Sequence, residues 1–332
     1  MSRYSALESF VDEGSRLRAF LPPFAFTSFF SPEDTLLCVC AAEAALSRAR
    51  SLKSASGESP EPLRIAELTS GSGLVGLHLL RIEKGSALMG LDVDPDGTET
   101  ATRNARVLGL SAHASFETAD LWSTNATSLL ASWSPHLLVC NPPYIPEPPR
   151  VKLKIEAGSG PNGTAHLLRT LEIANTLRPR TMALSWCSLS DPCRVLRQAA
   201  AIGYQLNSLF VVAIADGEYS RSVHEYLRGL PYAFISEDEL TVAAVAPDGS
   251  AAFAYLLMAG DFSRHERHDA DDDGVEKSVR DLCENFSRIG IDALSRPVAP
   301  IPVRRWILDR WDELRLRAFL HGPIERMAET TA

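Results

Sequence analysis

The sequence predicts a mixed α/β fold, with a mostly parallel sheet that carries helices on both faces. Short apolar runs alternate along the chain with segments whose apolar residues recur every three or four positions, as expected for strands and amphipathic helices. Several of the apolar runs end in an acid, a glycine turn or a pair of prolines. Because open sheets of this class bind ligands at the carboxyl ends of their strands, a site is expected at these endings.

The first predicted strand covers residues 64–68 and runs into a turn with glycines at Gly71 and Gly73, followed by a helical apolar pattern. Glycines at such a turn let the backbone approach a nucleoside closely and leave free N–H groups at the start of the helix. A glycine turn between strand and helix is common, so this feature alone is weak evidence.

Two further strands end in acids. Residues 87–91 lead into Asp92, roughly 20 residues beyond the glycines, which is the spacing at which nucleotide-binding α/β folds hold ribose hydroxyls. Residues 116–119 lead into Asp120, whose carboxylate can accept a hydrogen bond from an adenine amino group. Taken singly, each acid is explained equally well as a structural residue at a strand end. The order and spacing of the two together favour a nucleoside site.

The fourth predicted strand, residues 137–140, ends in Asn141-Pro142-Pro143-Tyr144. Two consecutive prolines stop the strand and fix φ near −65°, so they hold the flanking Asn141 and Tyr144 rigidly. The amide of Asn141 can accept a hydrogen bond from an NH2 group, and the ring of Tyr144 can stack on the flat group that carries it. This combination is typical of methyl transfer to a planar nitrogen. The plain alternative is a proline-rich turn without function.

With these features in this order, the chain resembles the class I S-adenosylmethionine-dependent methyltransferases, and within them the Asn-Pro-Pro-Tyr branch. That branch holds the HemK-type glutamine N5-methyltransferases and the N6-adenine methyltransferases of DNA and RNA. The resemblance covers roughly residues 26–210 and implies a Rossmann-like sheet of seven strands, with S-adenosyl-L-methionine as the cofactor. One position departs from the pattern, because Thr69 stands where the glutamine enzymes usually have glycine. The turn is therefore expected to be less open.

The resemblance also implies roles for individual residues. Asn141, Pro142 and Tyr144 would hold the acceptor nitrogen and form the catalytic set. The methionine part of the cofactor would lie along the glycine turn, the ribose at Asp92 and the adenine near Asp120. The full set assigned to the cofactor is Glu67, Thr69, Gly71, Gly73, Asp92, Asp120, Leu121 and Asn141.

Three acceptors stay open. Protein glutamine methylation, with a translation release factor as the model substrate, comes first, since Ile145-Pro146, the segment Gly160–Arg169 and the acidic turn Phe30–Leu37 look like their counterparts in HemK-type enzymes. Ser31–Asp34 within that turn is also explained as a plain helix cap. N6-adenine or other RNA or DNA base methylation is second. A small-molecule methyltransferase or an inactive cofactor-binding subunit is third.

The composition fits a globular protein. The chain has 332 residues, of which 45% are hydrophobic and 23% charged, and a net charge of −9, which argues against a dedicated nucleic-acid binder. A local basic stretch, Arg150, Lys152 and Lys154, could meet phosphates, an acidic partner or only solvent. No signal peptide or membrane-spanning run is present, which predicts a cytoplasmic protein that does not contact a membrane. The sequence carries no signal for oligomeric state or for a partner subunit.

Six cysteines show no Cys-x-x-Cys pair, and no cysteine or histidine grouping has the spacing of metal ligands. We interpret them as reduced thiols, and Cys140 as a core residue rather than a nucleophile. The run with His265, His268 and Asp269–Asp273 is expected to be a flexible acidic loop, with a metal site as the alternative.

The remaining pattern completes the expected organisation. We predict an N-terminal helical segment and linker at 1–60, a methyltransferase domain at 61–262, and an acidic loop with a helical extension at 263–332. Helices are expected near 166–177 and 193–202, and strands at 181–185 and 205–214. Strands at 241–246 and 252–259 would form a hairpin around Pro247–Ser250, and the extension would hold helices at 279–286 and 306–316, divided by the prolines of 297–302.

Overall fold

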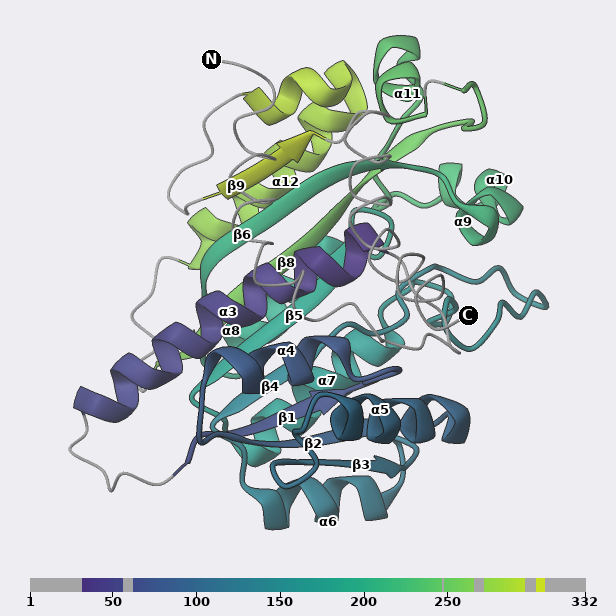
Figure 1. Cartoon of the computed structure of the whole chain (residues 1–332). Coiled ribbons are helices and arrows are strands. Elements are labelled where there is room, and N and C mark those ends of the chain that lie inside the picture. Colours follow the sequence, from purple (N-terminus) through teal and green to yellow (C-terminus); the bar gives the residue numbers. More distant parts are fainter. Residues whose placement is uncertain (1–31, 56–61, 247, 266–271, 296–302, 308–332) are drawn as a thin grey trace, which may run out of the picture. The chain divides into compact units, whose positions relative to one another are not determined.

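The computed structural model describes residues 32–55, 62–246, 248–265, 272–295 and 303–307. These residues fall into two compact units (Figure 1). The first holds the described residues up to Asn141, together with Pro179–Ala183. The second holds Pro142–Arg178 and the described residues from Leu184 to Ile307. The boundary between them falls inside the Asn-Pro-Pro-Tyr tetrapeptide.

The first unit is built around four parallel strands in the order β3-β2-β1-β4. Its helices flank these strands (Figure 1), and α3 packs on α4. In chain order the elements are α3 (Pro32–Ala55), β1 (Arg64–Leu68), α4 (Leu74–Ile82), β2 (Ala87–Asp92), α5 (Pro95–Val107), β3 (Ala114–Thr118), α6 (Thr124–Trp133) and β4 (Leu137–Cys140).

Local chemistry explains where the helices of this unit begin. The Asp94 side chain accepts a hydrogen bond from the Asp96 N–H and Pro95 occupies the first turn, so α5 has both a cap and a preset φ. Ser123 caps α6 in the same way by accepting from the Ala126 N–H. The strands bury both faces: every residue of β4 is buried, as are four of the five in β1.

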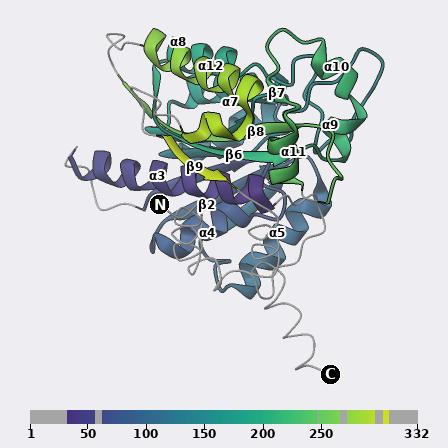
Figure 2. The ribbon, with the colours of Figure 1, turned by 90° about the horizontal axis from the view of Figure 1, so that it is seen from above.

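The second unit combines the remaining strands with seven helical segments, counted over its described residues. Its strands follow the order β5-β8-β6-β9, and β7 pairs with β8. β6 pairs antiparallel with β8 and parallel with β9, and α12 lies beside α8 (Figure 2). The elements are α7 (Ala165–Leu177), β5 (Thr181–Cys187, begun in the first unit), α8 (Pro192–Ala201), β6 (Tyr204–Ala215), α9 (Glu218–Ser222), α10 (His224–Arg228), β7 (Ile235–Ser236), α11 (Glu239–Val245), β8 (Ala254–Arg264), α12 (Asp272–Ile289), the 3-10 helix η1 (Gly290–Ser295) and β9 (Val303–Ile307).

The predicted fold class is confirmed, since the structure is mixed α/β with mostly parallel strands and flanking helices. The described part of the chain contains nine strands rather than seven, because β7 and β9 add to the expected set. The strands expected at 181–185, 205–214 and 252–259 are present as β5, β6 and β8, and the helices expected at 166–177 and 193–202 as α7 and α8.

The strand predicted at 241–246 is wrong, and with it the hairpin around Pro247–Ser250. This stretch forms the helix α11 instead. The Asp238 carboxylate accepts from both the Thr241 N–H at 2.9 Å and its hydroxyl at 2.8 Å, so a cap fixes the first turn. That cap outweighs the β propensity of the Thr-Val pair.

The expected C-terminal extension is confirmed in part. The pattern at 279–286 forms part of α12, with Val279, Leu282, Cys283 and Phe286 buried. The helix predicted at 306–316 is wrong at its start, because Trp306 belongs to β9, which pairs with β6. Residues 308–316 lie outside the described residues, as do 1–31, 56–61, Pro247, 266–271 and 296–302.

The described residues contain no group of His, Cys, Asp or Glu side chains arranged to hold a metal ion. None of their helices is both long and apolar enough to cross a bilayer. All six cysteines are free thiols, and five of them, Cys140 included, are buried.

Candidate functional site

The carboxyl ends of β1, β2 and β4 lie side by side in the first unit. Leu68 is in register with both Leu91 and Cys140, the last or next-to-last residues of the neighbouring strands. Asp92, at the end of β2, is in register with Thr118 at the end of β3. This alignment brings to one edge all eight residues predicted to hold the cofactor, as their placement directly at or after the strand ends requires.

Asp92 is tied to the glycine turn. Its Oδ2 accepts from the Gly71 N–H at 2.7 Å, and its Oδ1 accepts from the Asp94 N–H at 2.9 Å. Burial raises the pKa of this carboxyl, and the two backbone N–H groups oppose that shift. Each oxygen can accept one further hydrogen bond, so a rigidly oriented carboxylate is ready for the hydroxyls of a ribose.

Gly73 begins α4 and is required for packing. Its φ of 74° lies in the left-handed region, and a Cβ added there would lie 2.7 Å from Cζ of Phe116 and 3.0 Å from Cβ of Ala101. Any side chain at this position would push the Phe116 ring away. Packing and the backbone conformation therefore require glycine here, whether or not a ligand binds.

Glu67 lies at the buried side of the turn. It is 4% exposed, its Oε2 has no hydrogen-bond partner among the described residues, and a Cβ at Gly76 would sit 2.6 Å from that oxygen. Burial raises the pKa of Glu67 to about 8, while the backbone N–H groups of Gly76 and Val75 act against the shift. A buried carboxyl with a spare oxygen next to a glycine turn can accept a hydrogen bond from an ammonium group, and such a cation would favour the ionised form of the carboxyl.

Apolar surface is exposed at the same edge. Val93, directly after Asp92, is 44% exposed, and Trp122, two residues beyond Asp120, is 52% exposed. Asp120 is exposed and holds the Trp122 N–H at 2.9 Å through Oδ1, whereas Leu121 is buried. Together the acids offer acceptors for hydroxyl and amino groups, and the exposed side chains offer faces for a flat ring. The residues present therefore fit a nucleoside.

Thr69 adopts a backbone conformation that a β-branched residue rarely adopts. Its φ is 52°, in the left-handed region favoured by glycine. Its hydroxyl lies 2.6 Å from the carbonyl oxygen of Leu68 and 3.1 Å from that of Asn141, so its single hydrogen bridges the two. Thr69 therefore holds a backbone conformation that glycine adopts readily, and its hydroxyl adds a polar link to the loop after β4.

Asn141 has a fixed amide orientation. Its Nδ2 donates to Oδ2 of Asp34 at 3.2 Å. Because a carboxylate only accepts, the NH2 end of the amide faces Asp34 and Oδ1 faces the other way. Asn141 Oδ1 is buried and has no partner among the described residues. A buried amide oxygen without a partner is costly, which marks this atom as a place for a donor to bind.

The other motif residues belong to the second unit. Pro142 and Tyr144 are buried, Tyr144 to 8% exposure. The chain beyond them is held by the hydrogen bond from the Ile145 N–H to the Ala157 carbonyl at 2.9 Å. Gly163, with a φ of 66°, approaches the Tyr144 carbonyl so closely that no Cβ fits. The backbone of Tyr144 is thus fixed from both sides.

Two acids have contacts that the sequence does not indicate. Asp34 lies in the acidic turn that the sequence explains as a cap or a site contact, and its carboxylate holds the Asn141 amide. Glu147 follows the Asn-Pro-Pro-Tyr motif without any pattern of its own, yet its carboxylate accepts from the Leu153 and Gly160 N–H groups, each at 2.9 Å. The two hydrogen-bond partners of Glu147 lie six and thirteen residues away, which matches neither the spacing of a helix nor that of a strand. The sequence pattern therefore does not reveal these contacts. The position of Asp34 in a marked segment is the one sequence signal that leads toward its contact.

Known proteins are similar to part of this chain. A release factor glutamine methyltransferase from Rhodospirillum rubrum is 40% identical over 83 residues, which are 25% of this chain and 24% of that protein. A protein of the same name from Chlorobaculum tepidum is 33% identical over 120 residues, 36% of this chain and 40% of that protein. The predicted resemblance is confirmed. The matches span less than half the length of either relative, and no family profile matches the chain.

Among solved structures, a ribosomal protein L11 methylase from Lactobacillus delbrueckii aligns with 72% of this chain and 81% of its own, at 14% identity and a TM-score of 0.38. TrmN from Thermus thermophilus aligns with 75% of this chain and 53% of its own, at 16% identity and a TM-score of 0.39.

Proposed function

We propose that the protein is an S-adenosylmethionine-dependent methyltransferase that acts on the side-chain nitrogen of a protein glutamine. One observation carries the proposal: Asn141 Oδ1 is buried without a partner among the described residues, and Asp34 holds the amide so that this oxygen is available to a donor. A glutamine side chain brings such a donor in its NH2 group. The edge of the first unit supplies the nucleoside-fitting residues, among them Asp92.

Most of the catalytic effect would come from positioning. The cofactor, when bound, supplies a methyl group already activated on sulfur. Asn141 would accept a hydrogen bond from the acceptor NH2 and direct the nitrogen. Thr69 holds the Asn141 carbonyl, so the peptide that carries the amide does not rotate. Alignment of this kind is worth several kcal/mol without a strong base.

The proton balance needs no dedicated base. As the new N–C bond formed, the methyl–sulfur bond would break and the sulfur would leave with its electron pair as a neutral thioether. The acceptor nitrogen would gain the positive charge and become far more acidic, and one of its N–H protons would then pass to water. No carboxylate needs to be strongly basic for this step. Glu67, with its pKa raised to about 8 by burial, lies at the cofactor side of the edge and takes no part in it.

The names of the relatives support a release factor as the acceptor protein. The net charge of −9 is also better suited to a protein acceptor than to RNA, because nucleic-acid affinity depends on cationic side chains that neutralise phosphates. This acceptor is compatible with the cytoplasmic location expected from the sequence.

The test is transfer of labelled methyl to a purified release factor, with total RNA from the same cells as the competing acceptor. We expect label in the release factor and, after proteolysis, one peptide whose glutamine carries a single added methyl group. Label in RNA, with none in protein, would replace the proposal by adenine methylation. Binding of the cofactor without transfer to either would favour an inactive or partner-dependent subunit.

A further inference from the structure

The segment that follows the acceptor motif has an unusual composition for this chain. Residues 148–156, here the basic loop, begin four residues after Tyr144 and contain three cations, Arg150, Lys152 and Lys154. These alternate with three apolar residues, while the chain as a whole carries a net charge of −9. An alternation of cations and apolar side chains outside a strand does not follow from core packing.

The base of the loop is closed by a network of hydrogen bonds. Glu147 accepts from the Leu153 and Gly160 N–H groups with its two oxygens, each at 2.9 Å. The backbone of Gly158 lies so close to the Glu147 carboxylate that a Cβ at this position would clash with it. The Ser159 N–H donates to the Ile145 carbonyl at 3.0 Å, beside the bridge that pairs Ile145 with Gly158. The two ends of the loop are therefore fixed to each other.

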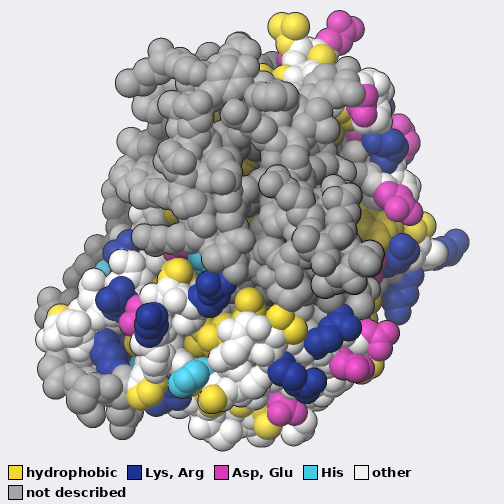
Figure 3. Space-filling model, in the orientation of Figure 1, with side chains coloured by type: hydrophobic (Ala, Val, Ile, Leu, Met, Phe, Trp, Pro, Cys, Tyr) yellow, Lys and Arg dark blue, Asp and Glu magenta, His cyan; other side chains and the backbone are white. Residues whose placement is uncertain are grey.

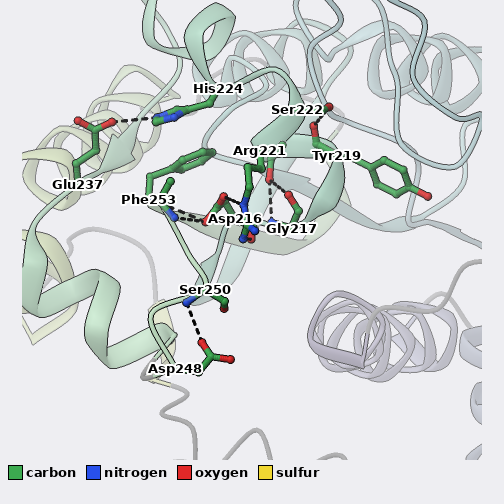
Figure 4. Close-up of polar contacts among 12 residues, drawn as sticks. Asp216, Gly217, Tyr219, Arg221, Ser222, His224, Glu237, Asp248, Ser250 and Phe253 are labelled. Atoms are coloured by element: carbon green, nitrogen blue, oxygen red, sulfur yellow. Dashed lines mark hydrogen bonds and ion pairs between the residues drawn. The ribbon is translucent and has the colours of Figure 1, made fainter.

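The C-terminal end of the loop is braced against α9. The Tyr219 hydroxyl donates to Glu156 Oε1 at 2.7 Å, and Lys154 Nζ lies 5.5 Å from the centre of the Tyr219 ring. Helix α9 is itself anchored by Arg221 to Asp216 at 2.6 Å, and Tyr219 points away from that ion pair (Figure 4). The one acid of the loop and the neighbouring aromatic ring are thus already engaged inside the unit.

What remains exposed on the loop is apolar and positive. Val151 is 47% exposed and Ile155 is 62% exposed, two of the seven large hydrophobic residues exposed in the described part of the chain. Arg150, Lys152 and Lys154 are exposed beside them. The loop extends away from the strands of its unit (Figure 1), and Lys and Arg side chains gather at the corresponding edge in the space-filling view (Figure 3). Apolar side chains held rigidly in water are stabilised when a partner covers them.

We propose that the basic loop is the docking surface for the acceptor protein and binds a face of that protein that is acidic and partly apolar. This inference rests on the proposed function, because it assumes that the acceptor is a protein. The alternation fits a protein surface better than RNA. Single-stranded RNA is held by exposed aromatic rings, whereas the loop itself contains no aromatic residue, and the neighbouring Tyr219 ring already has Lys154 Nζ 5.5 Å from its centre. The loop would add affinity for the acceptor protein.

The test uses the full chain and a purified release factor, with binding and methyl transfer measured separately. One variant reverses charge, Arg150→Glu with Lys152→Glu, and a second removes apolar surface, Val151→Ser with Ile155→Ser. The matched control, Arg103→Glu with Arg106→Glu, makes the same charge change at exposed positions of α5. Cofactor binding by calorimetry verifies that each variant is folded.

We expect both loop variants to raise the Kd for the release factor by about 10-fold or more, while kcat at saturating acceptor stays within about 2-fold. Binding by wild type should weaken with salt, and the charge-reversed variant should lose most of that dependence. The control should behave like wild type. An unchanged Kd in the loop variants, an equal loss in the control, or a loss of RNA binding instead would overturn the proposal.

The outcomes separate this proposal from the proposed function. Methylation of the release factor by wild type, with an unchanged Kd in the loop variants, would leave the function standing and remove the docking surface. Loop-dependent binding without any methylated glutamine would do the opposite. Neither binding nor methylation by wild type would overturn both.

Discussion

The turn after β1, residues 69–73, and the loop after β4, residues 141–144, follow neighbouring strand ends and are built in opposite ways. The turn uses positive φ angles, 52° at Thr69, 47° at Gly71 and 74° at Gly73, to aim backbone N–H groups. The loop uses two prolines, which donate nothing, to hold the side chain of Asn141. In the turn, Asp92 accepts the Gly71 N–H. Each region keeps one buried side-chain oxygen without a partner among the described residues, the hydroxyl of Ser70 in the turn and the amide oxygen of Asn141 in the loop.

The difference suits the two ligands of the proposed reaction. The backbone of the turn would hold the cofactor, and the side chain of Asn141 would hold the acceptor. A cofactor that is always the same molecule can be held by backbone shape, and substitutions there act through sterics. An acceptor group that must enter, react and leave is held by one oriented amide, and substitutions there act on turnover. Thr69 belongs to both regions, because its hydroxyl links the turn to the Asn141 carbonyl.

The largest effect is expected at the loop. Asn141→Ala removes the amide oxygen that would direct the acceptor nitrogen, and we expect turnover to fall by about 100-fold to 1,000-fold, in the range seen when one positioned polar group is lost. Affinity for S-adenosylmethionine, measured by calorimetry, should change by about 3-fold or less. Unchanged methyl transfer would remove Asn141 from the acceptor site.

The next largest effect is expected at the strand end that supports the turn. Asp92→Ala removes the proposed ribose contact and the partner of the Gly71 N–H. Hydrogen bonds to charged groups contribute about 1.5–3 kcal/mol, so cofactor affinity should fall by about 10-fold to 100-fold. Turnover at saturating cofactor should stay within about 5-fold of wild type. A fall in turnover at unchanged affinity would reverse the assignments of the two regions.

A third effect concerns stability and is expected at Glu67 in β1, just before the turn. Glu67 is protonated in the folded protein up to a pKa of about 8, whereas its ordinary value is 4.5. Between these values the folded state binds more protons than the unfolded state, so this contribution to stability is complete below pH 4.5 and is lost as the pH rises through about 8. Each unit of difference in pKa corresponds to about 1.4 kcal/mol.

Glu67→Gln removes this titration. The measurement is the free energy of unfolding in urea for wild type and variant at about pH 5.5, 7 and 8.5. As the pH rises, the wild type should lose stability relative to the variant. Parallel pH profiles for the two proteins would mean that Glu67 is ionised in the folded state. The Asp92→Ala protein serves as a second reference at the same edge.

The smallest effect is expected where the two regions meet. Thr69→Val keeps the shape of the side chain but removes the hydroxyl that reaches the Asn141 carbonyl, so turnover should fall by about 3-fold to 10-fold, the worth of one hydrogen bond. Thr69→Ser keeps the hydroxyl and should retain wild-type turnover. Thr69→Gly relieves the strained φ, yet it should show the same loss as Thr69→Val. Equal turnover in the Ser and Val proteins would mean that the link is only structural.

Local signals in the sequence were sufficient for the strand ends. An apolar run that stops at an acid, a glycine or a proline predicts both the strand and its edge, and Asp92, Asp120 and Asn141 all lie at or just after the ends of strands in the structure. The same reasoning failed at 241–246, because a cap from Asp238 fixes a helix over β-branched residues. Capping is a single contact, whereas strand propensity is summed over many residues and therefore dominates a prediction from sequence.

Contacts between distant segments could not be predicted. Asp34 and Asn141 are 107 residues apart. The acidic turn marks Asp34 as a cap or a site contact, but no pattern identifies Asn141 as its partner. The strand β9 carries two arginines in five residues, a composition typical of exposed chain rather than of a partner for β6. Pairing at long range is decided by the folded topology, which single-sequence patterns do not contain.

The pairing of β9 with β6 has a consequence for folding during synthesis on the ribosome. Leu209 pairs with Val303, and all the chain between them must be synthesised before the second strand leaves the ribosome. Until then the long hydrophobic strand β6 has an open edge on the nascent chain, which is a template for wrong pairing. A ribosome that stalls between these positions would release a fragment with this edge exposed, and chaperones would have to cover it.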